Sequence, residues 1–179
     1  MRLAILSDIH DHVWRLAAAL EHVRGTEALI CCGDLCSPFI VHQIGREYAN
    51  PVHIVFGNND ADLYRISAVA RLYPHVALHG ELFEGEFGGR PIAVQHFDNI
   101  ARPLAASGRY DAVFFGHNHR RETSRAGGTL LVNPGPILGA AFRADGSRED
   151  VASSYAVYDT DTGDVHAFQV LADGGVAPL

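Results

Sequence analysis

The sequence predicts an α/β fold that begins with a parallel sheet and continues with antiparallel hairpins. Up to about residue 71, short apolar runs alternate with segments whose apolar residues recur at helical spacing, an order typical of strand–helix–strand units. Beyond residue 80, apolar runs flank Gly-Gly or Asp-Thr-Gly-Asp turns, which predict hairpins. With 179 residues, 47% of them hydrophobic, the chain is long and apolar enough to bury a core.

Three strands and three helices are expected in the first half. The strands cover residues 3–6, 28–32 and 52–56. The first helix is capped by Asp11 and closed by Gly25, the second starts at Ser37-Pro38 and runs to about residue 49, and the third covers about residues 62–71. Because right-handed crossovers connect such strands, the three are expected to lie parallel in one sheet.

The second half predicts hairpins around one further helix. Strands at 81–87 and 90–95 form the first pair, a helix follows at about 99–107, and a strand at 112–115 precedes a second pair at 122–125 and 129–132. The polar residues 144–154 predict a mobile loop, and strands at 155–158 and 165–170 form the last hairpin. Since no repeat or long linker divides the chain, we expect residues 1–179 to form one domain.

Composition and charge narrow the class of function. The formal net charge of −7 argues against an extended nucleic-acid surface, which needs clustered lysine and arginine, but it allows a small phosphate ester. No apolar run is as long as a membrane span, and Ser7-Asp8 interrupts the first apolar run too early for a signal peptide. We therefore expect a cytoplasmic protein without a membrane partner.

The cysteines are Cys31, Cys32 and Cys36, and their odd number favours reduced thiols over a disulfide framework. Cys31 and Cys32 are adjacent on a predicted strand, so their side chains point to opposite faces. This favours small buried thiols over a cysteine-based metal site.

Five apolar runs end in side chains that are able to bind a metal. Open α/β sheets build their sites at the carboxyl ends of strands, so these side chains are expected to gather there. The candidate ligands are Asp8, His10, Asp34, Asn58, His96, His117 and His119.

The candidate ligands combine carboxylate and amide oxygens with imidazole nitrogens, which suits Mn, Fe, Zn or Ni better than Ca or Mg. The set is too large for one tetrahedral ion but sufficient for two ions if one carboxylate bridges them, and Asp34 is the expected bridge. Two ions about 3.5–4 Å apart clamp a phosphoryl group and lower the pKa of a bridging water. We therefore expect two divalent transition metal ions, with Mn as the first choice and Fe, Zn or Ni as alternatives.

These residues resemble the motifs of the calcineurin-like metallophosphoesterases: Asp8-x-His10, Gly33-Asp34, Gly57-Asn58-x-Asp60, His96 and Gly116-His117-x-His119. The small size and the Asn133-Pro134-Gly135 loop resemble the compact branch that includes the YfcE-type phosphodiesterases. The resemblance implies the metallo-dependent phosphatase fold, a four-layer α/β/β/α sandwich of two mixed β-sheets flanked by helices. It also implies that Asp34 bridges one metal held by Asp8, His10 and His119 and another held by Asn58, His96 and His117.

Two positions depart from the pattern of that family. Related enzymes often carry a histidine that assists the leaving group where this chain has Asn59, whose amide has no acidic proton to give. Asp60 keeps the carboxylate that would orient such a histidine, and Pro136 replaces a small polar residue. The residues expected to take part in catalysis are Asp34, Asn58, Asn59, Asp60 and His117.

The resemblance implies a dinuclear metal-dependent phosphoesterase, more readily a phosphodiesterase, in which a metal-bridging hydroxide attacks a small phosphate ester. Two alternatives stay open: a nucleotide or polyphosphate hydrolase of the same fold, and a non-catalytic interaction scaffold like the retromer subunit. The complete set of candidate ligands favours the enzyme. One of Arg120, Arg121 and Arg143 is expected to contact phosphate. The other histidines are expected to be structural, except that His12 lies near His10 and could face the site. A homo-oligomer is compatible with the sequence.

Overall fold

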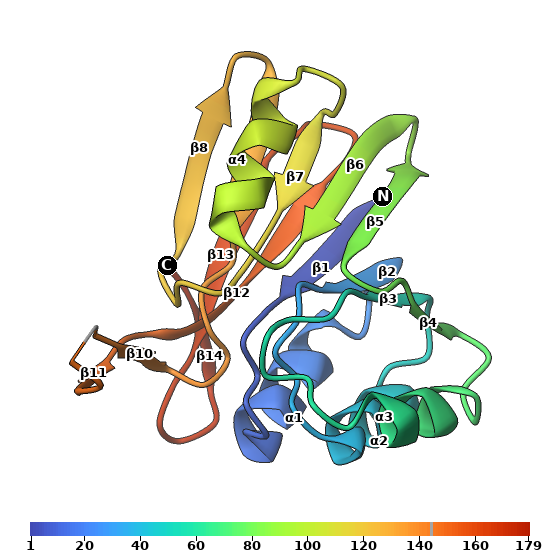
Figure 1. Ribbon diagram of the computed structural model, residues 1–179, viewed down its shortest axis with the longest axis vertical. Coiled ribbons are helices and arrows are strands. Elements are labelled where there is room, and N and C mark those ends of the chain that lie inside the picture. The colour runs from blue at the N-terminus through green and yellow to red at the C-terminus, as the bar shows by residue number, and fades with distance from the viewer. Residues whose placement is uncertain (144) are drawn as a thin grey trace.

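The computed structural model describes residues 1–143 and 145–179, which form two large β-sheets and flanking helices (Figure 1). The helices are α1 (Val13–Val23), α2 (Pro38–Glu47), α3 (Leu63–Ala70) and α4 (Asp98–Ala106). The strands are β1 (Arg2–Leu6), β2 (Ala28–Cys31), β3 (Val52–Ile54), β4 (Val76–Leu78), β5 (Leu82–Phe87), β6 (Arg90–Gln95), β7 (Ala112–Phe114), β8 (Glu122–Ala126), β9 (Thr129–Asn133), β10 (Ala140–Phe142), β11 (Arg148–Asp150), β12 (Ser153–Asp159), β13 (Val165–Val170) and β14 (Val176–Pro178). In this part of the chain, no helix combines the length and the apolar character needed to cross a membrane.

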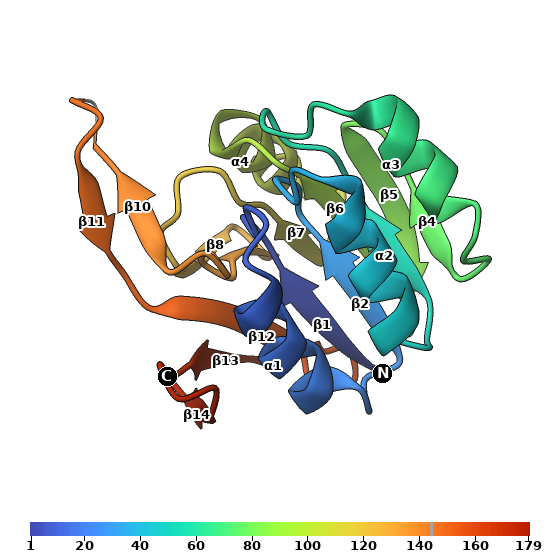
Figure 2. The same cartoon turned by 90° about the horizontal axis from the view of Figure 1, so that it is seen from below.

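Both large sheets are mixed. The seven-stranded sheet has the order β14-β13-β12-β1-β2-β3-β4, in which β1 to β4 are parallel and β12 to β14 are antiparallel. The five-stranded sheet has the order β5-β6-β7-β9-β8, and β6, β7 and β9 are parallel. A separate sheet of β10 and β11 projects from the body of the molecule (Figure 2).

Three apolar cores separate four layers. The first core joins α1, α2 and α3 to the seven-stranded sheet and includes Leu16 and Ile44. The second core lies between the two sheets and includes Ile30 and Phe114, whereas the third joins α4 to the five-stranded sheet and includes Ala101. This succession of layers confirms the predicted α/β/β/α sandwich.

The adjacent thiols Cys31 and Cys32 belong to different cores, Cys31 to the first and Cys32 to the second. They therefore face opposite sides of the seven-stranded sheet, as the strand geometry predicts. Burial raises the pKa of Cys31 to about 12, so this thiol is protonated and packs as a small apolar group.

Three local expectations differ from the structure. The cap of α1 is His12, whose Nδ1 accepts from the amide of Arg15 at 3.5 Å, while the carboxylate of Asp11 accepts from the amide of Ser37 at 3.2 Å. The mobile loop expected at 144–154 is wrong for β11 and for the start of β12, because these polar residues pair with β10 and β13; Ala144 lies outside the described residues. β4 and β14 were not predicted, since three residues are too few to show a strand alternation.

Candidate metal centre

The seven candidate ligands lie on loops that follow parallel strands. In the first sheet, Asp8 and His10 follow β1, Asp34 follows β2 and Asn58 follows β3; in the second sheet, His96 follows β6, and His117 and His119 follow β7. The carboxyl ends of these strands meet where the two sheets adjoin. The sandwich therefore brings together residues that are far apart in the sequence.

Backbone strain is concentrated in these loops. Five candidate ligands have a left-handed backbone, with φ of 51° at Asp8, 44° at His10, 56° at Asp34, 71° at His117 and 56° at His119. Such a conformation costs a residue other than glycine about 1–3 kcal/mol. Its repetition at five candidate ligands indicates that the tertiary structure, and not local preference, sets the directions of these side chains.

Two glycines let the backbone approach the carboxylates closely. A Cβ added at Gly57 would lie 2.2 Å from Asp34 Oδ1, and a Cβ added at Gly116 would lie 2.7 Å from Asp8 Oδ2 and 1.9 Å from Ser7 Oγ. Any larger residue would displace these groups, which explains why each of the two motifs contains glycine at this point.

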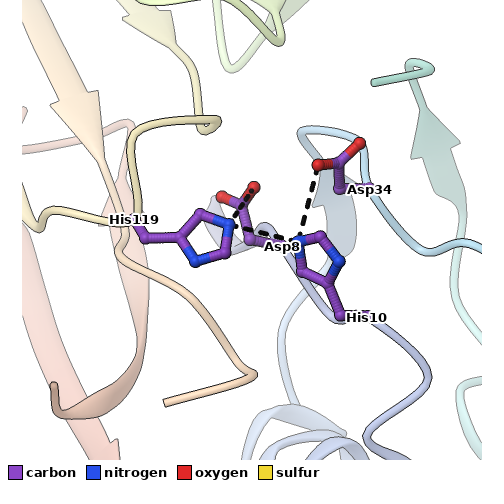
Figure 3. Close-up of side chains that lie close together, drawn as sticks. All are labelled: Asp8, His10, Asp34 and His119. Atoms are coloured by element: carbon purple, nitrogen blue, oxygen red, sulfur yellow. Dashed lines mark hydrogen bonds and ion pairs between the residues drawn. The ribbon is translucent and has the colours of Figure 1, made fainter. Parts of the chain in front are cut away.

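Asp8, His10, Asp34 and His119 form a first ligand group (Figure 3). One ligand atom from each lies within 4.8 Å of the others. His10 Nε2 lies 3.1 Å from His119 Nε2 and 3.5 Å from Asp34 Oδ2, and His119 Nε2 lies 3.3 Å from Asp8 Oδ1. Both carboxylates are buried, so water can solvate their charges only poorly.

Asn58, His96 and His117 form a second ligand group beside the first. Asn58 Oδ1 lies 3.2 Å from His96 Nε2 and 2.9 Å from His117 Nδ1. Asp34 Oδ2 lies 3.5 Å from His96 Nε2 and 3.5 Å from His10 Nε2 of the first group. One oxygen of Asp34 thus faces both groups, which is the position that a bridging carboxylate would occupy.

The hydrogen bonds of the histidines fit metal ligation. His96 Nδ1 donates to the carbonyl of Cys32 at 2.7 Å, and His119 Nδ1 donates to the carbonyl of Ala140. In the neutral rings, each Nε2 atom then carries a lone pair that points into the centre. Nitrogen lone pairs and carboxylate oxygens face one another there, which is favourable only with a proton or a cation between them. The nitrogen and oxygen donors suit divalent transition metals.

The pKa values of the buried ligands reflect the same crowding. Burial lowers the pKa of His96 and of His119, but the carboxylates of Asp34 and Asp8 outweigh this effect, so both pKa values lie above the usual 6.5. For His10, burial prevails over the same carboxylates and holds the pKa below its usual value. Burial raises the pKa of Asp34, but hydrogen bonds from His96 and Asn59 outweigh it, so the net pKa is lowered.

Asn59 donates two hydrogen bonds to Asp34. Its backbone N–H donates to Asp34 Oδ1 and its side-chain amide donates to Asp34 Oδ2, both at 2.8 Å. These contacts fix the orientation of the carboxylate that faces both ligand groups. They also give Asn59 a positioning role that the sequence did not suggest.

Asp60 joins the loop after β2 to the loop after β3. The side chain is 7% exposed and accepts hydrogen bonds from the amides of Asp34 at 3.0 Å, Cys36 at 2.8 Å and Gly57 at 2.7 Å. The resemblance implied a carboxylate that orients the side chain of residue 59, whereas these three hydrogen bonds all go to backbone amides. Burial raises the pKa of Asp60 despite the three donors.

A cleft of about 840 Å³ opens over the two ligand groups. Five of the candidate ligands line it together with Asn59, Asp98, Asn118, Arg120 and Phe142. Arg121 and Arg143 are not among these lining residues. Asn118 and Arg120 adjoin His119, and Asp98 follows His96 by two residues, so the motifs point to all three. Phe142 reaches the cleft only through the tertiary structure.

Two further residues support the ligand loops and were missed from the sequence. Asn133 Nδ2 donates to the carbonyl of Gly116 and to Asn118 Oδ1, both at 3.0 Å, and thereby braces the turn between His117 and His119. Cys36 Sγ lies 3.5 Å from His10 Nδ1, on the side of the ring away from the centre. The sequence Asn133-Pro134-Gly135 indicates a rigid loop, but it does not indicate that this loop contacts the turn between His117 and His119.

Comparisons with known proteins agree on the family. The sequence model of the calcineurin-like phosphoesterase superfamily domain matches residues 1–163. Phosphodiesterase MJ0936 of Methanocaldococcus jannaschii is 27% identical over 143 residues, which cover 78% of this chain and 86% of that protein.

Solved structures share the fold. A structure described as a novel archaeal phosphodiesterase has a TM-score of 0.80 at 21% identity, with all of both chains covered. YfcE, a phosphoesterase from E. coli, has a TM-score of 0.66 at 18% identity, covering 100% of this chain and 98% of its own. Vps29 from Entamoeba histolytica complexed with Zn²⁺ has a TM-score of 0.68 at 18% identity, covering 100% of this chain and 97% of its own.

At these identities the structural likeness establishes the fold alone, and phosphoesterases share that fold with Vps29. The family rests on the sequence match, which extends over most of the chain and includes all five ligand-bearing motifs. The chain belongs to the calcineurin-like phosphoesterase superfamily.

Proposed function

We propose that the protein is a phosphodiesterase that uses two divalent metal ions held by the two ligand groups. The observation that carries the proposal is the position of Asp34 Oδ2, 3.5 Å from His10 Nε2 and 3.5 Å from His96 Nε2. The family and the name of the curated relative favour a phosphodiester as substrate.

When bound, a pair of such ions supplies positive charge for the phosphoryl group and makes a water more acidic. The side chains of this protein set the geometry. Asp8 and Asp34 provide anionic oxygens, Asn58 provides an amide oxygen, and the histidines provide neutral nitrogens. Asn59 donates a hydrogen bond to each carboxylate oxygen of Asp34, and the backbone N–H of His117 donates to Asp8 Oδ2 at 3.1 Å.

The cleft suits a negatively charged ester. Arg120 lines its wall, and we propose that the guanidinium of this residue binds a non-bridging phosphate oxygen. We assign Asn59 and Asp60 to positioning, since their hydrogen bonds go to Asp34 and to the ligand loops. The catalytic contacts to substrate then fall to Asp34, Asn58 and His117 at the centre.

The mixed nitrogen and oxygen donors favour Mn, and Fe, Zn or Ni are the alternatives. We also propose that residues 1–179 act as one cytoplasmic domain, consistent with the free thiols of Cys31, Cys32 and Cys36. A scaffold role is less favoured, because a protein that only binds partners has no need of five strained ligand positions.

The test is Asp34→Asn, assayed for bound metal and for hydrolysis of bis(4-nitrophenyl) phosphate. We expect loss of metal from both groups and loss of turnover, since one oxygen of Asp34 faces both. Asp62→Asn is the matched control, because Asp62 caps α3 outside the cleft and asparagine caps equally well. Near-normal turnover with two equivalents of metal in Asp34→Asn would contradict the proposal.

A further inference from the structure

We infer that Phe142 forms an aromatic wall of the cleft and packs against a flat ring carried by the phosphodiester substrate. This inference rests on the proposed function and adds to it the substrate class: diesters in which the esterified group that stays on the phosphate after hydrolysis bears a planar aromatic or heteroaromatic ring. Figure 2 shows the β10–β11 hairpin that carries Phe142 standing away from both large sheets.

The cleft is larger than a phosphate group requires. Its volume of about 840 Å³ lies in the range of pockets that take a whole drug-sized molecule. Among the described residues that line it, nine have polar side chains and Phe142 is the single apolar one. An organic group bound beside the phosphate therefore has one apolar surface available, and that surface is a flat ring.

Phe142 is placed by the same strand that orients a candidate ligand. The carbonyl of Ala140 accepts from His119 Nδ1, and Phe142 lies two residues further along β10. The centroid of its ring is 6.0 Å from that of His119, with 67° between the ring planes. The two rings are arranged edge to face, so this contact covers at most one face of the Phe142 ring.

The ring is available because it is mostly exposed. Phe142 is 60% exposed, and a single exposed phenylalanine on a protein surface would be unremarkable by itself. This one lies in the wall of the cleft that contains both ligand groups. Covering its face with a substrate ring would bury apolar area and add a favourable stacking contact.

The root of the hairpin is fixed to the body of the protein. Arg15 donates to the carbonyl of Leu138, and the amide of Leu138 donates to the carbonyl of Asp8 at 3.0 Å. Phe142 itself pairs with Arg148 across the hairpin. A wall held in this way is present before the substrate arrives, which reduces the entropy lost on binding.

Phenylalanine recognises shape and not hydrogen-bonding pattern. Its ring offers neither donor nor acceptor, so it accepts any flat group, whereas Arg120 beside it attracts the phosphate charge. Removing such a stacking partner weakens binding of an aromatic group by about 5- to 150-fold. Binding of a small alkyl ester should change little.

The experiment compares Mn²⁺-loaded wild type, Phe142→Ala and Phe142→Leu on three diesters that share one leaving group: phenyl, ethyl and hexyl 4-nitrophenyl phosphate. In Phe142→Ala we expect KM for the phenyl ester to rise about 5- to 150-fold and KM for the ethyl ester to change less than about twofold. Phe142→Leu should restore the wild-type KM for the hexyl ester but not for the phenyl ester. Phe39→Ala is the matched control, because Phe39 is a 77%-exposed aromatic residue on α2 outside the cleft.

Bound Mn²⁺ is measured in each variant, since Phe142 also touches His119. Equal changes for all three esters, or changes explained by lost Mn²⁺, would overturn the inference and leave Phe142 as a cover for that histidine. Full recovery of the phenyl ester by Phe142→Leu would also overturn it, in favour of a general apolar contact.

A wild type that hydrolyses none of the esters would contradict the proposed function itself. Calorimetric titration with phenylphosphonate and methylphosphonate then decides the inference separately. A preference for phenylphosphonate that Phe142→Ala removes supports the aromatic wall, and the same affinity for both phosphonates overturns it.

Discussion

Asp60 offers the sharpest test of how the fold holds the candidate centre. Its carboxylate is 7% exposed and joins two loops through three backbone amides, those of Asp34, Cys36 and Gly57. Replacing it with alanine removes the acceptor for all three. The candidate ligand Asp34 is left in place, so the change separates support of the centre from metal ligation.

The magnitude follows from the three hydrogen bonds. A buried donor left without a partner costs about 1–3 kcal/mol, and because two of the three amides are only partly buried, we expect Asp60→Ala to lower the free energy of unfolding by about 3–6 kcal/mol. Asp60→Asn keeps one oxygen for the amides of Asp34 and Gly57 but turns an NH₂ group toward the amide of Cys36. It should therefore cost about 1–3 kcal/mol.

The assay is urea unfolding of metal-free protein in excess chelator, followed by circular dichroism. Chelation is needed because bound metal would stabilise the folded state and mix ligation with support. Asp62→Ala is the control: Asp62 accepts from the amide of Arg65 at 3.1 Å as the cap of α3, and its loss should cost about 1 kcal/mol. An Asp60→Ala protein destabilised no more than Asp62→Ala would refute the reasoning.

Three other predictions concern the centre directly. In metal-free protein, His117→Gly should be more stable than His117→Ala by about 1 kcal/mol in urea, because only glycine relieves the left-handed backbone with φ of 71°. Asn59→Ala should weaken Mn²⁺ binding by about 10- to 100-fold in a titration, because Asp34 loses the amide that orients it. Asn59→His adds a titrating proton and should raise turnover of alkyl diesters more than turnover of aryl diesters. Equal effects on both classes of diester would contradict a role of residue 59 at the leaving group. Because the pKa values of His96 and His119 are raised in the folded state, protonation of these two rings stabilises metal-free protein. This contribution is fully present below about pH 6.5 and should disappear as pH rises through the folded-state pKa values. With Mn²⁺ present the dependence should reverse, since protons compete with the metal, and thermal unfolding against pH with and without chelator measures both.

The sequence predicted the fold well where a pattern extends over several residues. The three strands and three helices expected in the first half, and the hairpin of β5 and β6, appear within a few residues of the expected bounds, whereas β4 was missed. β10 and β11 were missed because each has three residues and their polar sequence, Arg148 to Asp150 in β11, gives no alternation. Their pairing depends on contacts that no local pattern encodes.

The candidate ligands could be predicted because each lies just after a predicted strand and matches a motif position of the family that the sequence resembles. The supporting residues could not. Asn59 and Asp60 occupy motif positions, but their hydrogen-bond partners depend on how two loops meet in space. Phe142 has no motif at all, and only the chain path that brings β10 beside His119 places it in the cleft.

The apolar cores stabilise the strained loops that carry the candidate ligands. Left-handed backbone at five ligands costs about 1–3 kcal/mol at each, and crowded carboxylates and imidazoles add repulsion among lone pairs. The three apolar cores and the contacts of Asp60 and Asn133 must offset this cost, because they act on the ligand loops without any metal. We therefore expect the sandwich to arrange the candidate ligands before an ion binds. Metal should accordingly raise the stability of a fold that already exists, and chelation should lower the unfolding temperature without abolishing cooperative unfolding.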